Sequence, residues 1–219
     1  MTRTQKFALI RLMVNIVFTV TTRKGLENLE RSLINITPDL VGNRVLCLVQ
    51  GEPQLYVDCR QSIKEKIDKC ESLVVYVEED ENLFRKAAEY LDKGSFVFVS
   101  NENIILPKRC VSRLAKHYIE RRGAGFYAGH FVEYETTYWV SDIYNDKPER
   151  IKWEDQQGLV EVDTAIPFAM VTRLETFKEL FCQAELGDFG PLSYGIRLRR
   201  QGYINYVDFD VRISYGGKK

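Results

Sequence analysis

Residues 94–107 read GSFVFVSNENIILP, and this stretch decides which fold the chain can adopt. An alternating apolar run ends abruptly in the polar residues SNEN (100–103), after which an apolar triplet leads to Pro107. In an open α/β sheet, polar side chains at the carboxyl end of a strand face the crevice where ligands bind. The stretch therefore predicts a buried strand that ends in binding groups, provided that its surroundings form such a sheet.

The same polar cluster has a second interpretation. Asn and Ser side chains bond to their own backbone and so favour turns. Asn101 and Asn103 can therefore mark a strand-ending turn that binds nothing, and the residues by themselves leave both interpretations open.

Apolar periodicity makes this strand the fourth in a series. β-branched and apolar runs predict strands over residues 14–20, 44–50, 72–77 and 95–99. Apolar spacings of three and four residues predict helices from about residue 25 to just before Pro38, around 84–91 and over 111–119, and residues 55–67 are interpreted as a polar helix that covers the second strand. Strands that alternate with helices imply parallel βαβ units with right-handed crossovers.

The second half of the chain has a different pattern. It predicts an exposed strand at 131–140, a polar loop at 141–155, helices around 173–181 and 192–201, and a final strand pair or extended tail from residue 204. The overall prediction is one α/β domain over residues 1–219. In it a Rossmann-like, mostly parallel central sheet flanked by helices is joined to a smaller, mixed C-terminal half.

Composition excludes several classes of protein. The 219 residues are 45% hydrophobic and 28% charged, which is enough to bury a full core. Thirty-one basic residues balance 31 acidic ones, so no global basic field favours nucleic acid as a partner. No run of eighteen uncharged apolar residues predicts a membrane span. The five cysteines include no C-x-x-C pair, which favours reduced core thiols and a cytoplasmic location.

Two familiar signals are set aside. Residues 123–128 fit G-x-G-x-x-A, but they follow a helix and precede a strand, the reverse of a dinucleotide fingerprint, so we interpret them as a turn. His117 and His130 have no second His or Cys at ligand spacing, which indicates structural or surface roles.

The order of elements resembles the GT-A fold of nucleotide-sugar glycosyltransferases, especially the inverting family 2. VFTVTTRKGLENLERSL (17–33) is similar to the family's opening strand and helix, and RVLCLVQGE (44–52) to its second strand. The resemblance implies that about 14–120 binds the donor, expected to be UDP-linked, and that about 121–219 shapes the site of a glycan or other hydroxyl acceptor. By position in the family pattern, the donor-binding residues are then Thr21, Thr22, Arg23, Gln50, Arg85, Asn101, Asn103 and Arg197.

The family's fourth strand ends in Asp-x-Asp, whose acids hold Mn²⁺ or Mg²⁺ on the donor diphosphate. Counting back from Pro107 places Asn101 and Asn103 at those positions. Both metals favour anionic oxygen, and two neutral amides remove two formal charges from such a site. Glu102 is the one carboxylate left to ligate a metal, and strand alternation turns it away if its neighbours point inward.

The catalytic acids of the family are also displaced. The segment GDFGPLSYGIRLRRQGY (187–203) resembles the acceptor-side helix, but Gly190 and Pro191 occupy the place of the acidic pair. Asp188 and Glu185 lie just upstream and are the candidate general bases. Tyr215 stands where many relatives carry a metal-ligating His.

Two functions remain open. One is a glycosyltransferase, with or without metal, in which cations offset the charge of the leaving diphosphate. The available cations are Arg23, Lys24, Arg197, Arg199 and Arg200. The other is a catalytically inactive binding or assembly module, since fold does not imply function. A nucleotidyltransferase would need a Gly-rich phosphate loop or clustered acids near the first strand, and residues 21–24 have no such Gly run.

Overall fold

The computed structural model describes residues 13–67, 70–121, 123–131, 139–141, 148–150, 156–165, 169–182 and 191–216. Its helices are α1 (Arg23–Leu40), α2 (Pro53–Lys66), α3 (Leu83–Glu89), α4 (Cys110–Glu120), α5 (Leu174–Phe181) and α6 (Pro191–Arg200). Its strands are β1 (Val14–Val20), β2 (Arg44–Gln50), β3 (Glu71–Val77), β4 (Phe96–Ser100), β5 (Ile104–Ile105), β6 (Ala124–Phe131), β7 (Trp139–Ser141), β8 (Pro148–Arg150), β9 (Leu159–Val162), β10 (Ala169–Arg173) and β11 (Ile204–Tyr215).

Nine of these strands form one sheet in the order β3-β2-β1-β4-β10-β6-β11-β5, with β9 paired to β11. The pairs β2–β3, β1–β2, β1–β4 and β6–β11 are parallel, so β1 to β4, β6 and β11 run in one direction and β5, β9 and β10 run against them. The predicted α/β fold, mostly parallel with a mixed C-terminal half, is confirmed.

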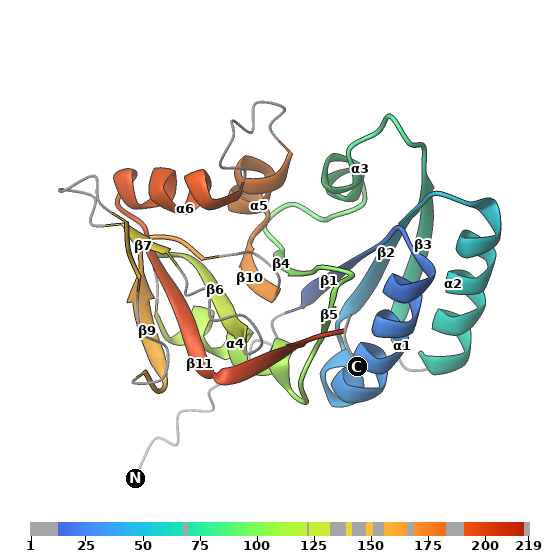
Figure 1. Ribbon diagram of the computed structural model, residues 1–219, viewed down its shortest axis with the longest axis horizontal. Coiled ribbons are helices and arrows are strands. Elements are labelled where there is room, and N and C mark those ends of the chain that lie inside the picture. The colour runs from blue at the N-terminus through green and yellow to red at the C-terminus, as the bar shows by residue number, and fades with distance from the viewer. Residues whose placement is uncertain are drawn as a thin grey trace, which may run out of the picture.

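Helices cover both faces of this sheet (Figure 1). On one face α1 packs against α2 and α4, and on the other α3 packs against α5, which in turn contacts α6. β1 is buried along its whole length, as expected for a strand between two helical layers. The sheet therefore exposes the carboxyl ends of its parallel strands along one edge, where ligands bind in open α/β folds.

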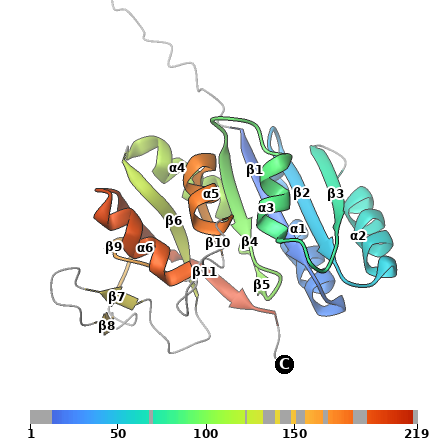
Figure 2. The same cartoon turned by 90° about the horizontal axis from the view of Figure 1, so that it is seen from above.

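Strand β10 is inserted between β4 and β6 and is antiparallel to both (Figure 2). It joins two strands that come earlier in the chain. Its partners Phe98 and Tyr127 are fully buried, so the junction belongs to the core.

Helix α1 does not end before Pro38, as its sequence predicts, but continues to Leu40. Proline has no N–H to donate to the carbonyl of residue 34. The Thr37 hydroxyl donates to Ile34 O at 3.1 Å instead, and also to Leu33 O at 3.0 Å. The side chain before the proline therefore replaces the missing donor, and the last turn survives.

The prediction for residues 123–128 is wrong. Only Gly123 has the left-handed φ of a turn, at 93°, and residues 124–131 form β6, which lies in the core. A Cβ at Gly125 would collide with Oδ1 of Asn205, so at this position glycine permits a close strand contact.

Other parts of the second half are more regular than their sequence predicts. Pro148–Arg150 forms β8, paired with β7, inside the stretch interpreted as a loop. The predicted strand at 131–140 and the rest of that loop largely lie outside the described residues. Residues 204–215 form one strand, with a register shift between Asp208 and Arg212.

All five cysteines are free thiols, as their spacing predicts. Cys47, Cys59 and Cys110 are buried, and desolvation raises the pKa of the half-buried Cys70 and Cys182 to about 11 each. These thiols therefore remain protonated and unreactive near neutral pH. No helix within the described ranges has the length and apolar character needed to cross a membrane.

Candidate donor-binding site

Residues 101–103 form a tight turn between β4 and β5. The Asn101 side-chain oxygen accepts from the N–H of Asn103 at 2.8 Å, which is the local bond expected of an Asn-led turn. The turn interpretation is therefore correct for Asn101. The Asn103 side chain is exposed and makes no hydrogen bond within the described part of the chain, so its amide is free to meet a ligand.

The Glu102 carboxylate reaches across the sheet edge to the β1–α1 connection. Its Oε2 accepts from the N–H groups of Thr21 at 2.7 Å and Thr22 at 3.2 Å, and from the Thr22 hydroxyl at 3.3 Å. Its Oε1 accepts from the Thr21 hydroxyl at 2.5 Å. Strand alternation does not apply to this side chain because residue 102 lies in a turn.

A polar stripe on α1 holds the segment that follows β4. Asn28 Nδ2 donates to Glu102 O at 2.9 Å, Ser32 Oγ accepts from Leu106 N at 3.0 Å, and Asn35 Nδ2 donates to Leu106 O at 2.8 Å. Their spacing of four and three residues puts them on one helix face. The sequence motifs considered above do not include this stripe, and its helical spacing beside the leucine face is the signal that could have revealed it.

The stripe continues to Asp39, which is nearly fully buried. Its Oδ2 accepts from Val111 N at 3.2 Å and so contacts the start of α4. Burial raises the pKa of this carboxyl above its usual range. Helix α1 is thus bound by polar groups to the chain on the far side of the turn.

The end of β11 completes this edge of the site. Tyr215 is in register with Ile104 of β5, and the N–H of Gly216 donates to Asn103 O at 2.8 Å. A Cβ at Gly216 would collide with the side chain of Asn28. The structure therefore brings Tyr215 beside the turn at 101–103, as the resemblance implies.

Two other predicted donor-binding residues, Gln50 and Arg85, bind backbone carbonyls in other segments of the chain. Gln50 Nε2 donates to Glu78 O at 2.6 Å and Glu81 O at 3.1 Å, and so holds the loop after β3. Arg85 Nη2 donates to Cys182 O at 3.2 Å and holds the end of α5. Both side chains therefore join the elements that carry them to neighbouring loops.

Several of the candidate cations already have acidic partners. Arg23 forms an ion pair with Asp58, and donation by the guanidinium lowers the pKa of that carboxyl. Lys24 pairs with Glu27, and Arg199 with Glu161 and Asp163. Arg197 and Arg200 lie exposed on the last turn of α6. The pairs of Arg23 and Lys24 are exposed and therefore weak, so a diphosphate can compete for these two cations, whereas the Arg199–Asp163 pair is largely buried.

The two candidate general bases cannot be placed. Asp188 and Glu185 lie outside the described residues, between the end of α5 and the start of α6. Cys182, the residue before that segment, is the one held by Arg85.

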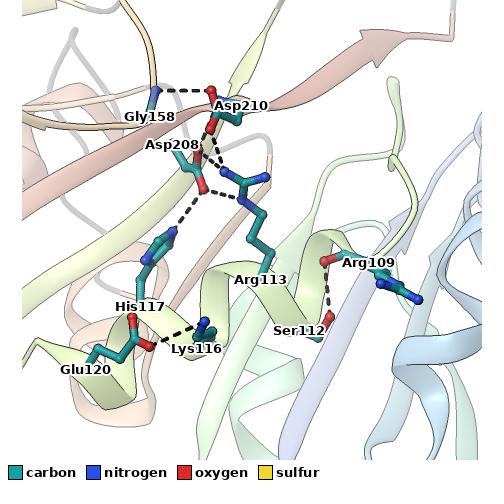
Figure 3. Close-up of polar contacts among 9 residues, drawn as sticks. All are labelled: Arg109, Ser112, Arg113, Lys116, His117, Glu120, Gly158, Asp208 and Asp210. Atoms are coloured by element: carbon teal, nitrogen blue, oxygen red, sulfur yellow. Dashed lines mark hydrogen bonds and ion pairs between the residues drawn. The ribbon is translucent and has the colours of Figure 1, made fainter.

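A separate ionic cluster joins α4 to β11 (Figure 3). Asp208, whose side chain is 1% exposed, accepts from Arg113 Nε at 2.7 Å and contacts His117 Nε2 at 2.9 Å. Asp210 pairs with Arg113 at 2.7 Å, and donation from Gly158 N and Arg113 lowers its pKa. The structural role predicted for His117 agrees with these contacts.

The groups present at the turn do not fit Mn²⁺ or Mg²⁺. Both oxygens of Glu102 are occupied by hydrogen bonds, and its neighbours supply neutral amides. Nowhere in the described ranges do three His, Cys, Asp or Glu side chains gather as a metal site would require. Asn101 and Asn103, which align with the Asp-x-Asp acids of the family, therefore do not form a suitable metal site.

Comparison with known proteins identifies the fold. The chain matches no protein-family model and no curated protein sequence. Its structure is similar to the mannosyltransferase PcManGT from Pyrobaculum calidifontis, solved with GDP-Man and Mn²⁺, with a TM-score of 0.65, 14% identity and 96% of this chain covered. It is also similar to GalNAc-T7, solved with UDP, GalNAc and Mn²⁺, with a TM-score of 0.67, 11% identity and 93% covered.

The chain spans 59% and 43% of the lengths of those two proteins. At such low identity the likeness concerns the arrangement of strands and helices. The protein has the GT-A-type fold of nucleotide-sugar glycosyltransferases.

Proposed function

We propose that the protein transfers a sugar from a nucleotide-sugar donor to an acceptor hydroxyl, without a metal ion held at the Asp-x-Asp positions. The observation that carries the proposal is the turn at 101–103. In a GT-A-type fold it lies at the carboxyl end of β4, and it is bonded to the β1–α1 connection and to the end of β11. Three elements thus converge where open α/β sheets bind ligands.

The hydrogen-bonding groups around the turn suit a nucleotide better than a metal complex. Amide groups such as that of Asn103 can pair with base or ribose oxygens, because an amide both donates and accepts. The N-terminus of α1, which Thr22 caps, lies at the same place, and its helix dipole favours anions. The N–H and hydroxyl groups of Thr21 and Thr22 are themselves bonded to Glu102, so these residues support the site through their position. A UDP-linked donor remains our expectation from the family resemblance, and the screen must include GDP-linked donors because one fold relative was solved with UDP and the other with GDP-Man.

The chemistry assigned to the chain is general base catalysis. Asp188, or Glu185 in its place, accepts the proton of the acceptor hydroxyl as that oxygen attacks the anomeric carbon. The bond from the anomeric carbon to the diphosphate breaks, and arginines such as Arg197 and Arg200 offset the charge of the departing group.

A specific observation supports the second function, a non-catalytic module that binds the same donor. Neutral residues stand at both Asp-x-Asp positions, and Gly190 and Pro191 replace the acidic pair of the family. Binding and turnover must therefore be measured separately.

The first test is a thermal-shift screen against UDP-, GDP- and dTDP-sugars, each with Mn²⁺ and with EDTA. A ligand at a hundred times its dissociation constant stabilises a protein by about 2.7 kcal/mol. For a chain of this length, that corresponds to a rise in Tm of roughly 5 to 10 °C. We expect one nucleotide class to raise the Tm equally under both conditions.

Each other outcome has a definite meaning. A shift that requires Mn²⁺ contradicts metal-free donor binding, and the absence of any shift contradicts the donor site. A shift without release of nucleoside diphosphate, in the presence of candidate acceptors, favours the non-catalytic module.

A further inference from the structure

Glu102 makes contacts that a strand-ending turn does not require. Two backbone N–H groups and two hydroxyls, from Thr21 and Thr22, converge on its carboxylate. Such a set of donors beside a helix N-terminus has the chemistry of an anion-binding site. Here the anion is part of the chain itself.

Space is left for this carboxylate on the opposite side. Gly25, in the first turn of α1, has no side chain, and a Cβ there would collide with Oε2 of Glu102. The φ of Gly25 is not left-handed, so its value here lies in the room that it leaves. Donors on one side and this gap on the other fix where the carboxylate lies.

The turn that carries Glu102 is held independently. Asn28 Nδ2 donates to Glu102 O, and Gly216 N donates to Asn103 O. Backbone and side chain together therefore join β4, the β1–α1 connection, α1 and the end of β11.

We infer that Glu102 is a positioning residue, which fastens the β1–α1 connection to the end of β4 and so shapes the donor site where a metal-dependent enzyme would use a cation. This inference rests on the proposed function, because it assigns Glu102 a part in donor binding. It explains why a carboxylate persists between two asparagines although it is not placed to ligate a metal. Its effect on the donor is indirect, through the threonines that it holds.

The same contacts are also compatible with a second role, in which the Glu102 carboxylate occupies the hydrogen-bond donors of Thr21 and Thr22 until a donor phosphate displaces it. The two roles predict opposite changes in nucleotide affinity when Glu102 is replaced. Removing a fastening residue weakens nucleotide binding, whereas removing a competitor strengthens it. The bonds from Asn28 and Gly216 favour the fastening role, because they hold the turn in place whatever the carboxylate does.

The test is the dissociation constant of the nucleotide sugar found in the screen, and of pyrophosphate, for wild type and two variants. Glu102→Gln removes the charge, whereas Gly25→Ala keeps it but occupies the place of Oε2. We expect both variants to raise the donor dissociation constant at least tenfold, equally with Mn²⁺ and with EDTA. We expect the donor KM to rise by a larger factor than kcat falls.

Glu79→Gln is the matched control, because Glu79 is exposed and its replacement changes the net charge by the same amount. It should leave the dissociation constant within twofold of wild type. Hydrogen exchange of the Thr21 and Thr22 amides, measured without nucleotide, should quicken at least tenfold in both test variants. This measurement does not depend on donor binding.

Several results would overturn the inference. Tighter binding of pyrophosphate to Glu102→Gln would make Glu102 a competitor, and an unchanged donor affinity in both variants would leave it no part in the site. Mn²⁺-dependent binding that Glu102→Gln abolishes would make it a metal ligand. If wild type binds no nucleotide sugar but the exchange result holds, the proposed function fails while the contact itself stands.

Discussion

Replacing Asp208 by alanine is expected to lower the free energy of unfolding by about 3 kcal/mol, at the lower end of what breaking a buried ion pair costs. The side chain is 1% exposed and is bonded to Arg113 and His117 on α4, and to the N–H of Asp210. Its removal takes the acceptor away from Arg113 Nε and from the N–H of Asp210 and leaves His117 without this partner, while Arg113 Nη2 keeps its bond to Asp210. Arg113 is 44% exposed, so water compensates part of the loss.

Asp210→Ala is the matched comparison, because Asp210 shares the Arg113 partner but is 49% exposed. We expect it to cost less than about 1 kcal/mol, as exposed pairs do. Urea denaturation of both variants gives the two values. Equal losses would show that the burial of Asp208 does not determine its contribution.

Asp188→Asn is expected to lower turnover by about a hundredfold or more, the usual consequence of losing a general base. An amide retains the shape of the carboxylate but does not accept a proton, so donor affinity should remain near that of wild type. The measurement is release of nucleoside diphosphate at saturating donor, together with the donor dissociation constant.

Glu185→Gln is measured in parallel, since either acid can fill the role. A large loss with only one of the two identifies the base. Full turnover in both variants would show that neither acid of residues 183–190 is the base, and Asp80→Asn, an exposed acid outside this segment, serves as the control for charge.

Local periodicity was sufficient to predict the first half of the fold. Each of its four long strands is rich in apolar and β-branched residues, and most of its helices carry an apolar face, so these elements needed little information from distant residues. Misreadings arose where tertiary contact overrides a local signal. The strand at 124–131 contains glycines that indicate a turn, and these glycines permit close contacts with β11.

The site was harder to predict because its main contacts join distant residues. The bonds from Thr21 and Thr22 to Glu102 connect positions about eighty residues apart in the chain. No spacing rule relates those positions, so the sequence indicated only that polar residues follow two strands. The direction of the Glu102 side chain follows from the turn, which the alternation argument treated as strand.

The insertion of β10 between β4 and β6 has a consequence for the order of assembly during synthesis. Strand β6 leaves the ribosome about forty residues before β10, a delay of a few seconds at roughly 5 to 20 residues per second. Until β10 arrives, β4 and β6 each lack a partner strand that they have in the finished sheet. Unpaired edges of this kind promote association between nascent chains. The nascent chain is therefore expected to need chaperones during the interval that begins when residue 131 has been made and ends when residue 173 has been made.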